Sequence, residues 1–329
     1  MDGYLTTQLL YVAAELGIAD LLADRPLGGR EIASAAGVPA APLTRVLRGL
    51  AAEGVLSEDD DGRFSLTPLG DALRTDTSTS LRGAVLVRAD LYYGAAAGLL
   101  TAVRDGGTAF EQAHGTPFFD HLAAHPAQEA RFAASMAARA SREAADVVAT
   151  YDFGGIGRIV DVGGGTGTLL AAVLHSAPGL DGVLVDRAGP VEQARARFAA
   201  EGLADRTRCL EGDFFEAVPP GADAYLLSRV LHDWDDGRAG RILDACHRAA
   251  PATARLVVVE ALLPDLAAEA PEAIRMDLHM LVLLGSAERS AAQYESLLGA
   301  SGFVVRRILP SRSPTGVCVI EAAPVPSWR

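Results

Sequence analysis

The chain has 329 residues, in which 42 aspartates and glutamates outnumber 29 basic residues, for a formal net charge of −13. All the basic residues are arginines, and the acidic balance argues against nucleic acid as a partner. The chain opens without a basic and apolar leader, and no uncharged apolar run is long enough to span a membrane. We therefore expect a soluble, cytoplasmic protein without a membrane partner, built from one or two domains.

Residues 1–75 are predicted to form a winged-helix-like domain. An apolar helical pattern ends at Gly17, helices are expected over 30–38 and 41–50, and a hairpin follows over 55–66. Such a motif often binds DNA, but residues 1–70 hold ten acids and five arginines, and the hairpin tip is acidic. We interpret this domain as the interface of a homodimer, with a DNA-binding regulator as the disfavoured alternative.

Residues 76–153 are predicted to be a helical linker whose aromatic residues, at 91–93, 118–119 and 132, belong to the core or line an apolar pocket. A turn at 151–155 leads into the third region, residues 154–329. There, apolar strands at 158–162, 182–186, 206–210, 223–228 and 255–260 alternate with helical patterns, which predicts a doubly wound, mostly parallel α/β sheet. No helix separates the last two apolar runs, 303–305 and 316–320, so the last strand should be antiparallel.

A glycine-dense turn follows the strand at 158–162. Gly163, Gly165 and Gly167 lack a Cβ atom, so a ligand can approach the backbone closely before the helix that opens at Thr168. A dinucleotide fingerprint has Gly or Ala where Thr168 stands. The turn therefore favours a nucleoside cofactor without a pyrophosphate and opposes a dehydrogenase.

Acids follow the next two strands of the predicted sheet. Asp186 can accept both hydroxyls of a ribose, and Asp213 can bond an adenine amino group while Phe214 packs on the ring. Each acid alone could be an ordinary solvated loop residue. Together with Asp161 they end consecutive strands, at the edge where open α/β sheets bind ligands.

A histidine follows the fourth strand and could act as a general base near neutral pH. His232 lies beside the predicted cofactor crevice, and Glu260 and Glu288 could orient its ring and raise its basicity. The alternatives are a core or helix-capping role for His232 and a salt bridge between Glu288 and Arg289. We expect no metal, because the three cysteines have no metal-ligand spacing and no acidic or histidine cluster proposes one.

Taken together, these motifs resemble the plant-type (caffeate/hydroxyneurine-like) O-methyltransferases, especially their bacterial relatives in antibiotic and polyketide pathways. The resemblance covers the whole chain and implies S-adenosylmethionine as the cofactor. It places Gly163 and Gly165 under the methionine part, Asp186 on the ribose, and Asp213 with Phe214 on the adenine.

The same resemblance implies that His232 is the general base and that Glu260 and Glu288 support it. Many plant members have a lysine where this chain has Ser228, so a charged contact with the cofactor is lost there, although Ser228 could still bond it. The implied reaction is in-line methyl transfer to a hydroxyl of a small aromatic or polyketide-type molecule.

Other reactions remain open. A non-methylating family member, such as a hydroxylase or decarboxylase, should lack the base, and His232 is present. An N- or C-methyltransferase is also an alternative. The identity of the acceptor depends on the pocket formed by residues 90–140 and 272–284, which the sequence alone does not specify.

Overall fold

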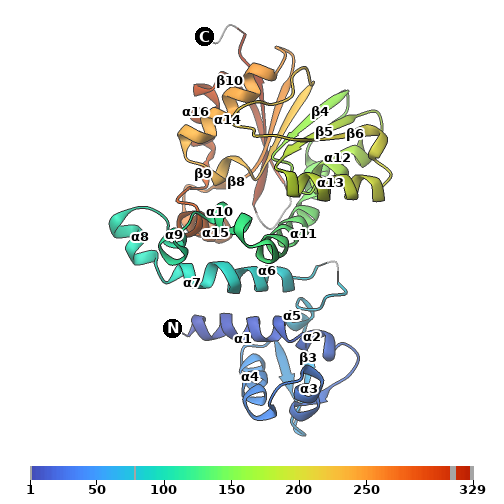
Figure 1. Cartoon of the computed structure of the whole chain (residues 1–329), viewed down its shortest axis with the longest axis vertical. Helices are drawn as coiled ribbons and strands as arrows, with labels where there is room; N and C mark the ends of the chain where they lie inside the picture. The colour runs from blue at the N-terminus through green and yellow to red at the C-terminus, as the bar shows by residue number, and fades with distance from the viewer. Residues whose placement is uncertain (1, 78, 312–315, 327–329) are drawn as a thin grey trace. The chain divides into compact units, whose positions relative to one another are not determined.

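The structure, a computed structural model, describes residues 2–77, 79–311 and 316–326 (Figure 1). It divides into two compact units, residues 1–97 with 122–135, and residues 98–121 with 136–329. The division of the sequence at residues 75 and 153 stays a prediction. Within the described ranges, no helix has the length and apolar character needed to cross a bilayer.

The N-terminal unit begins with helices followed by a small antiparallel sheet in the order β1-β3-β2. Its elements up to residue 71 are α1 (Gly3–Glu15), α2 (Ile18–Leu21), β1 (Leu27–Gly28), α3 (Gly29–Ala36), α4 (Ala40–Ala52), β2 (Leu56–Glu58), β3 (Arg63–Leu66) and α5 (Pro68–Asp71). Ile32, Leu47 and Phe64 are fully buried in its core. At the acidic hairpin tip, the Asp59 carboxylate accepts backbone N–H bonds from Asp61 and Arg63, which stabilises the tight turn.

Short helices and one long helix connect this region to the large sheet. They are α6 (Arg82–Val87), the π-helix η1 (Arg88–Tyr92), α7 (Tyr93–Ala96), α8 (Leu99–Asp105), α9 (Ala109–His114), α10 (Phe118–Ala124) and α11 (Pro126–Thr150). The helical character predicted for 76–153 is present, and α11 ends just before the turn at 151–155.

The large sheet has the strand order β10-β11-β8-β7-β4-β5-β6, with the short β9 pairing beside β8. Strands β4 to β8 are parallel, and β11 runs antiparallel between β8 and β10, which confirms the predicted sheet and its antiparallel last strand. The strands are β4 (Arg158–Val162), β5 (Asp181–Asp186), β6 (Thr207–Glu211), β7 (Ala224–Ser228), β8 (Arg255–Leu263), β9 (Arg289–Ser290), β10 (Phe303–Pro310) and β11 (Val317–Pro324).

Apolar side chains cover both faces of this sheet because its strands alternate between two cores. In β7, Tyr225 and Leu227 belong to one cluster, while Ala224 and Leu226 belong to the other. Helices α14 (Asp236–Ala249) and α16 (Ala291–Ala300) pack on the first face, and α12 (Thr168–Ser176) and α13 (Ala188–Ala200) on the second (Figure 1). Continuous apolar strands are typical of a parallel sheet buried on both sides.

Strand β8 is longer than predicted. The sequence prediction ends it at Glu260, but the strand continues to Leu263. Ala261 pairs with Val317 of β11, and Leu262 and Leu263 pair with β9. Glu260 therefore lies inside a strand, where its backbone pairs with Cys318 of β11.

Candidate active site

The glycine turn after β4 leaves room for a ligand. Gly163, Gly165 and Gly167 have φ angles of 72°, 56° and 73°, a region that side-chain-bearing residues rarely adopt. A Cβ atom on Gly163 would lie 2.9 Å from Val230 and 3.4 Å from Phe214, whereas one on Gly165 would meet nothing within 4 Å. The turn thus packs against Val230, which follows β7, at Gly163 and faces open space at Gly165.

Asp186, at the end of β5, holds this turn directly. Its Oδ2 accepts a 2.8 Å hydrogen bond from the Gly165 amide, and its Oδ1 accepts one of 2.7 Å from the Arg187 amide. Asp161 is fully buried beneath the turn, and burial together with the nearby Asp186 raises its pKa to about 7. A Cβ atom on Gly164 would lie 2.5 Å from the Asp161 carboxylate, so this part of the turn also requires glycine.

The chain after β6 brings Asp213 and Phe214 to the same edge of the sheet. Asp213 is exposed, and its Oδ1 accepts a 2.8 Å hydrogen bond from the Phe215 amide. The Phe214 ring lies edge-on to Trp234, with 6.4 Å between ring centroids, and contacts the glycine turn as described above. Phe214 therefore lies near both the glycine turn and the segment that carries His232 and Trp234.

After β7 ends at Ser228, which pairs with Val259 of β8, the chain turns sharply into the 3₁₀-helix η3 (Leu231–Asp233). Glu260 Oε1 accepts hydrogen bonds from the amides of Val230 (3.1 Å) and Leu231 (2.9 Å). A buried carboxylate thus fixes the backbone of the turn immediately before His232.

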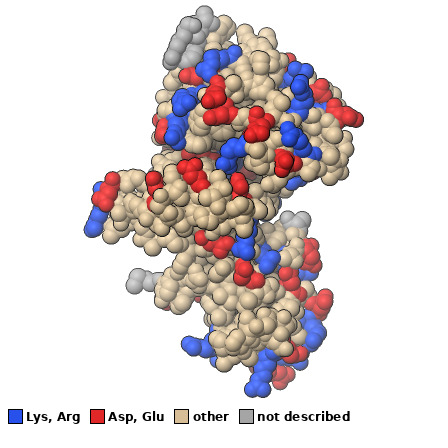
Figure 2. Space-filling view, in the orientation of Figure 1, with Lys and Arg blue, Asp and Glu red and all other residues tan. Residues whose placement is uncertain are grey.

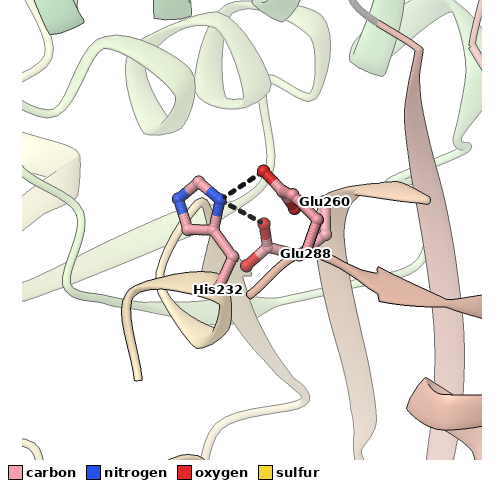
Figure 3. A group of neighbouring side chains, drawn as sticks. All are labelled: His232, Glu260 and Glu288. Atoms are coloured by element: carbon pink, nitrogen blue, oxygen red, sulfur yellow. Dashed lines mark hydrogen bonds and ion pairs between the residues drawn. The ribbon is translucent and has the colours of Figure 1, made fainter. Parts of the chain in front are cut away.

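His232 and the two predicted glutamates lie together in the interior (Figure 3). His232 Nδ1 is 2.8 Å from Glu288 Oε1, a hydrogen bond, and 3.7 Å from Glu260 Oε2. His232 is 5% exposed, and the glutamates are 0% and 1% exposed. A proton on Nδ1 shared with Glu288 leaves Nε2 as the acceptor nitrogen when the ring is neutral.

The sequence left open a salt bridge between Glu288 and Arg289. In the structure, Arg289 instead contacts Asp236 and two backbone carbonyls. It lies 2.8 Å from Asp236 and donates hydrogen bonds to the carbonyls of Leu231 and Trp234, at 2.8 and 2.7 Å. Arg289 thereby binds backbone carbonyls of η3 and the residue after it, whereas Glu260 binds backbone amides before His232. Glu288 is directed toward His232.

The ionisation of this cluster differs from that of exposed side chains. Burial alone lowers the pKa of His232, but the carboxylates of Glu260, Asp233 and Glu288 outweigh that effect and raise the pKa to about 9. Burial raises the pKa of Glu260 to about 6. For Glu288, the favourable charge of His232 and the hydrogen bond with it overcome burial and lower the pKa.

Three further charged residues belong to the cluster and were not predicted from the sequence. Arg229 lies 3.0 Å from Glu143 and 3.8 Å from Glu288, and Arg139 lies 3.0 Å from Glu143. Glu143 and Arg139 come from α11, in the region that the sequence analysis predicts only to be a helical linker. No local pattern distinguishes a buried arginine from the solvated ones around it, so these residues had no sequence signal.

The side chains of His232, Glu260 and Glu288 each offer an atom within 4.8 Å of the others, a spacing that metal sites also show. These groups already bind one another, and the Arg229 guanidinium lies beside Glu288. A second cation would therefore be repelled at the same carboxylates, and we assign them no metal role.

A cavity of about 440 Å³ opens next to this cluster. Phe118, Phe119 and Trp234 contribute aromatic walls, and Asp233 links the cavity to His232, since its Oδ1 lies 3.4 Å from His232 Nε2. The rings of Phe119 and Trp234 are stacked, with 6.1 Å between centroids. A larger cavity of about 600 Å³ lies beyond the amino end of β4 and contains none of the predicted site residues.

The parallel sheet with its antiparallel last strand, the open glycine turn and the acid at the end of the next strand define a class I methyltransferase fold. Comparison with known proteins assigns the family. Residues 97–304 match the O-methyltransferase domain, and residues 1–76 match the O-methyltransferase dimerisation domain. The chain belongs to this O-methyltransferase family.

Individual relatives match over nearly the whole chain. A phenazine O-methyltransferase, PhzM, from Lysobacter antibioticus is 44% identical over 99% of this chain and 94% of its own. An 8-amino-8-demethylriboflavin N,N-dimethyltransferase from Streptomyces davaonensis is 37% identical over 92% of this chain and 88% of its own.

Among solved structures, the O-methyltransferase NcsB1 from neocarzinostatin biosynthesis was crystallised with S-adenosylmethionine and 2-hydroxy-5-methyl naphthoic acid. It is 36% identical, with a TM-score of 0.86, and the match covers 98% of this chain and 96% of that one. The present protein is an S-adenosylmethionine-dependent O-methyltransferase.

Proposed function

We propose that this enzyme methylates a hydroxyl group of a small aromatic or polyketide-type molecule, with His232 as the general base. The observation that carries the proposal is the buried 2.8 Å contact between His232 Nδ1 and Glu288 Oε1. His232 lies two residues beyond Val230, and Val230 packs against the glycine turn at Gly163. A base beside a methyl donor is most useful for a hydroxyl acceptor, because an amine is nucleophilic without one.

The cofactor would be held by residues on three successive strand ends. Gly163 and Gly165 would lie under its methionine part, Asp186 would accept the ribose hydroxyls, and Asp213 with Phe214 would contact the adenine. Ser228, at the end of β7, is the remaining contact that we assign. Bound S-adenosylmethionine would supply an electrophilic methyl group on its sulfonium, with S-adenosylhomocysteine as the leaving group when the acceptor oxygen takes that methyl.

The task of His232 is to remove the proton from the acceptor. A phenol has a pKa of about 10, so little phenolate exists at neutral pH. The neutral His232 ring takes this proton at Nε2, and Glu288 stabilises the imidazolium that forms. Since the pKa of His232 is about 9, its neutral form is the minority at pH 7, and kcat/KM should rise with pH toward that value.

The cavity beside Asp233 is the proposed acceptor site. Its volume of about 440 Å³ suits a molecule of two or three fused rings, and stacked Phe119 and Trp234 would hold a flat ring system. Residues 108–120 and 283–285 contribute to its lining, so it draws on both regions named from the sequence and extends just past the second.

The replacement His232→Ala tests the base. Binding of S-adenosylmethionine should stay nearly unchanged, because no adenosine contact is assigned to this side chain. Turnover at pH 7 should fall by about 10²–10⁴-fold, the usual share of a general base, and should recover partly at higher pH as the acceptor ionises unaided. His175→Ala is a matched control, because His175 is exposed on α12 and its ring is hydrogen-bonded to Glu201 at the surface.

Two results would overturn the proposal. A wild-type rate for His232→Ala with a phenolic acceptor at pH 7 would leave catalysis to positioning alone. Mass spectra that locate the new methyl group on nitrogen or carbon would remove the hydroxyl assignment.

A further inference from the structure

Arg229 has an unusual backbone and an unusual environment. Its φ angle is 56°, and no other residue except glycine has a positive φ among the described residues. A left-handed backbone is strained for a residue with a Cβ atom, whereas glycine would be unstrained there. Such strain persists only where other contacts compensate for it, so the side chain of Arg229 should have a specific role.

The side chain bridges two glutamates that come from distant parts of the chain. Its Nη2 atom lies 3.0 Å from Glu143 Oε1 on α11, and its Nη1 atom lies 3.8 Å from Glu288 Oε1. The side chain is 14% exposed, and its buried Nε and Nη1 atoms have no hydrogen-bond partner among the described residues. Its position is therefore set by Glu143, while its positive charge acts on Glu288.

We propose that Arg229 is a positioning residue that keeps Glu288 ionised and directed at His232, and thereby sets the pH range in which His232 acts as a base. The inference rests on the proposed function only where it concerns activity. Its central claim, that Arg229 controls the protonation of His232, is independent of what His232 does.

The charges around Arg229 determine the direction of the effect. Glu143 and Arg139 face it from α11, Glu260 from β8, Cys318 from β11, and Glu288 from the segment before β9; His232 and Asp233 follow it in η3. The positive charge of Arg229 lowers the pKa of Glu260, Glu288 and Asp233, partly offsetting their burial.

Removing this charge should make the whole cluster bind protons more tightly. The additional proton could reside on His232 or on a glutamate, because strongly coupled groups titrate together. In either case the productive form, a neutral His232 beside an ionised Glu288, would need a higher pH. An opposite charge within 4–6 Å shifts a pKa by about 1–3 units, so we expect a shift of at least about one unit.

Arg229→Gln and Arg229→Lys separate charge from structure. Both replacements keep a side chain on the left-handed backbone, so backbone strain affects them equally. Lysine keeps the positive charge, and glutamine does not. Glu143→Gln supplies the opposite perturbation, since it removes a negative charge 3.0 Å from Arg229 and should lower the proton affinity of the cluster.

The experiment is an NMR titration of the His232 ring in the free enzyme, assigned by its loss in His232→Gln, together with the pH profile of kcat/KM. Arg229→Gln should raise the apparent pKa in both by about one unit or more, Arg229→Lys should raise it less, and Glu143→Gln should lower it. Circular dichroism would verify that each variant is folded.

Equal shifts for the glutamine and lysine variants, or a reduced rate with an unchanged His232 titration, would mean that Arg229 is only structural. The titration also separates the two proposals. If His232→Ala is fully active but Arg229→Gln still shifts the His232 titration, the base assignment fails and the inference about Arg229 stands.

Discussion

The two glutamates beside His232 act on different parts of the site, one on the ring and the other on the backbone before it. Glu288 contacts the ring at Nδ1, whereas Glu260 accepts two backbone amides of the preceding turn and reaches the ring only at 3.7 Å. Glu288 thus fixes the tautomer, and Glu260 fixes the place from which the ring projects. Both were predicted to support His232, but their division of labour depends on which oxygen reaches which atom, and spacing along the chain does not contain that information.

A single residue also offers a direct test of cofactor recognition. Asp186→Ala should weaken the binding of both S-adenosylmethionine and S-adenosylhomocysteine by about tenfold or more, since hydrogen bonds to a charged group contribute about 1.5–3 kcal/mol. It would also release the Gly165 amide that Asp186 now holds. Asp181→Asn, at the exposed opposite end of the same strand, is the matched control. Calorimetry showing unaltered affinity for Asp186→Ala would return Asp186 to an ordinary loop role.

At the scale of elements, the glycine turn at 163–167 depends on how closely α12 approaches α13. A Cβ atom on Gly167 would lie 2.5 Å from Phe198 Cζ, and the φ of Gly167 is 73°. Gly167→Ala should therefore destabilise the protein by about 1–3 kcal/mol through steric overlap and backbone strain.

A double-mutant cycle with Phe198→Leu, measured by urea unfolding, separates the two contributions to the loss of stability in Gly167→Ala, steric overlap and backbone strain. The smaller leucine side chain should relieve the overlap but not the strain, so the double variant should be more stable than the sum of the single changes predicts. Additive effects would mean that Phe198 does not cause the overlap.

Secondary-structure elements were predictable where a local sequence pattern defines them. They were less predictable where pairing with distant segments sets their ends. Four of the five parallel strands are short runs of mostly buried residues, and the edge strand β6 is only partly buried but still packs Cys209 and Leu210 against the two cores. All five were found because the pattern is local. The end of β8 was misplaced because its last residues pair with β9 and β11, which lie about thirty to sixty residues further along the chain. Arg229 was missed for a similar reason, since its partner Glu143 lies 86 residues away.

At the scale of the whole molecule, charge and exposed apolar surface bear on its partners. Figure 2 shows arginines and acids interspersed on the face drawn, without a continuous basic area that would attract a nucleic acid backbone. The match to a dimerisation domain over residues 1–76 suggests a homodimer. Within that matched region, helix α1 exposes Tyr4 and Leu5 at 57% and 50%, and these side chains are candidates for the surface that a second copy would cover.

We therefore expect a homodimer held by the N-terminal domain and no retention on DNA. Light scattering at low micromolar concentration should report twice the chain mass of 34.2 kDa. Leu5→Asp should shift the population toward the monomer, because a charge buried in an apolar interface without a partner is costly. Leu266→Asp is the matched control, since Leu266 is 65% exposed but lies outside the dimerisation domain. A monomeric wild type, or binding to DNA at physiological salt, would contradict this assignment of residues 1–75, and dissociation by Leu266→Asp alone would place the interface elsewhere.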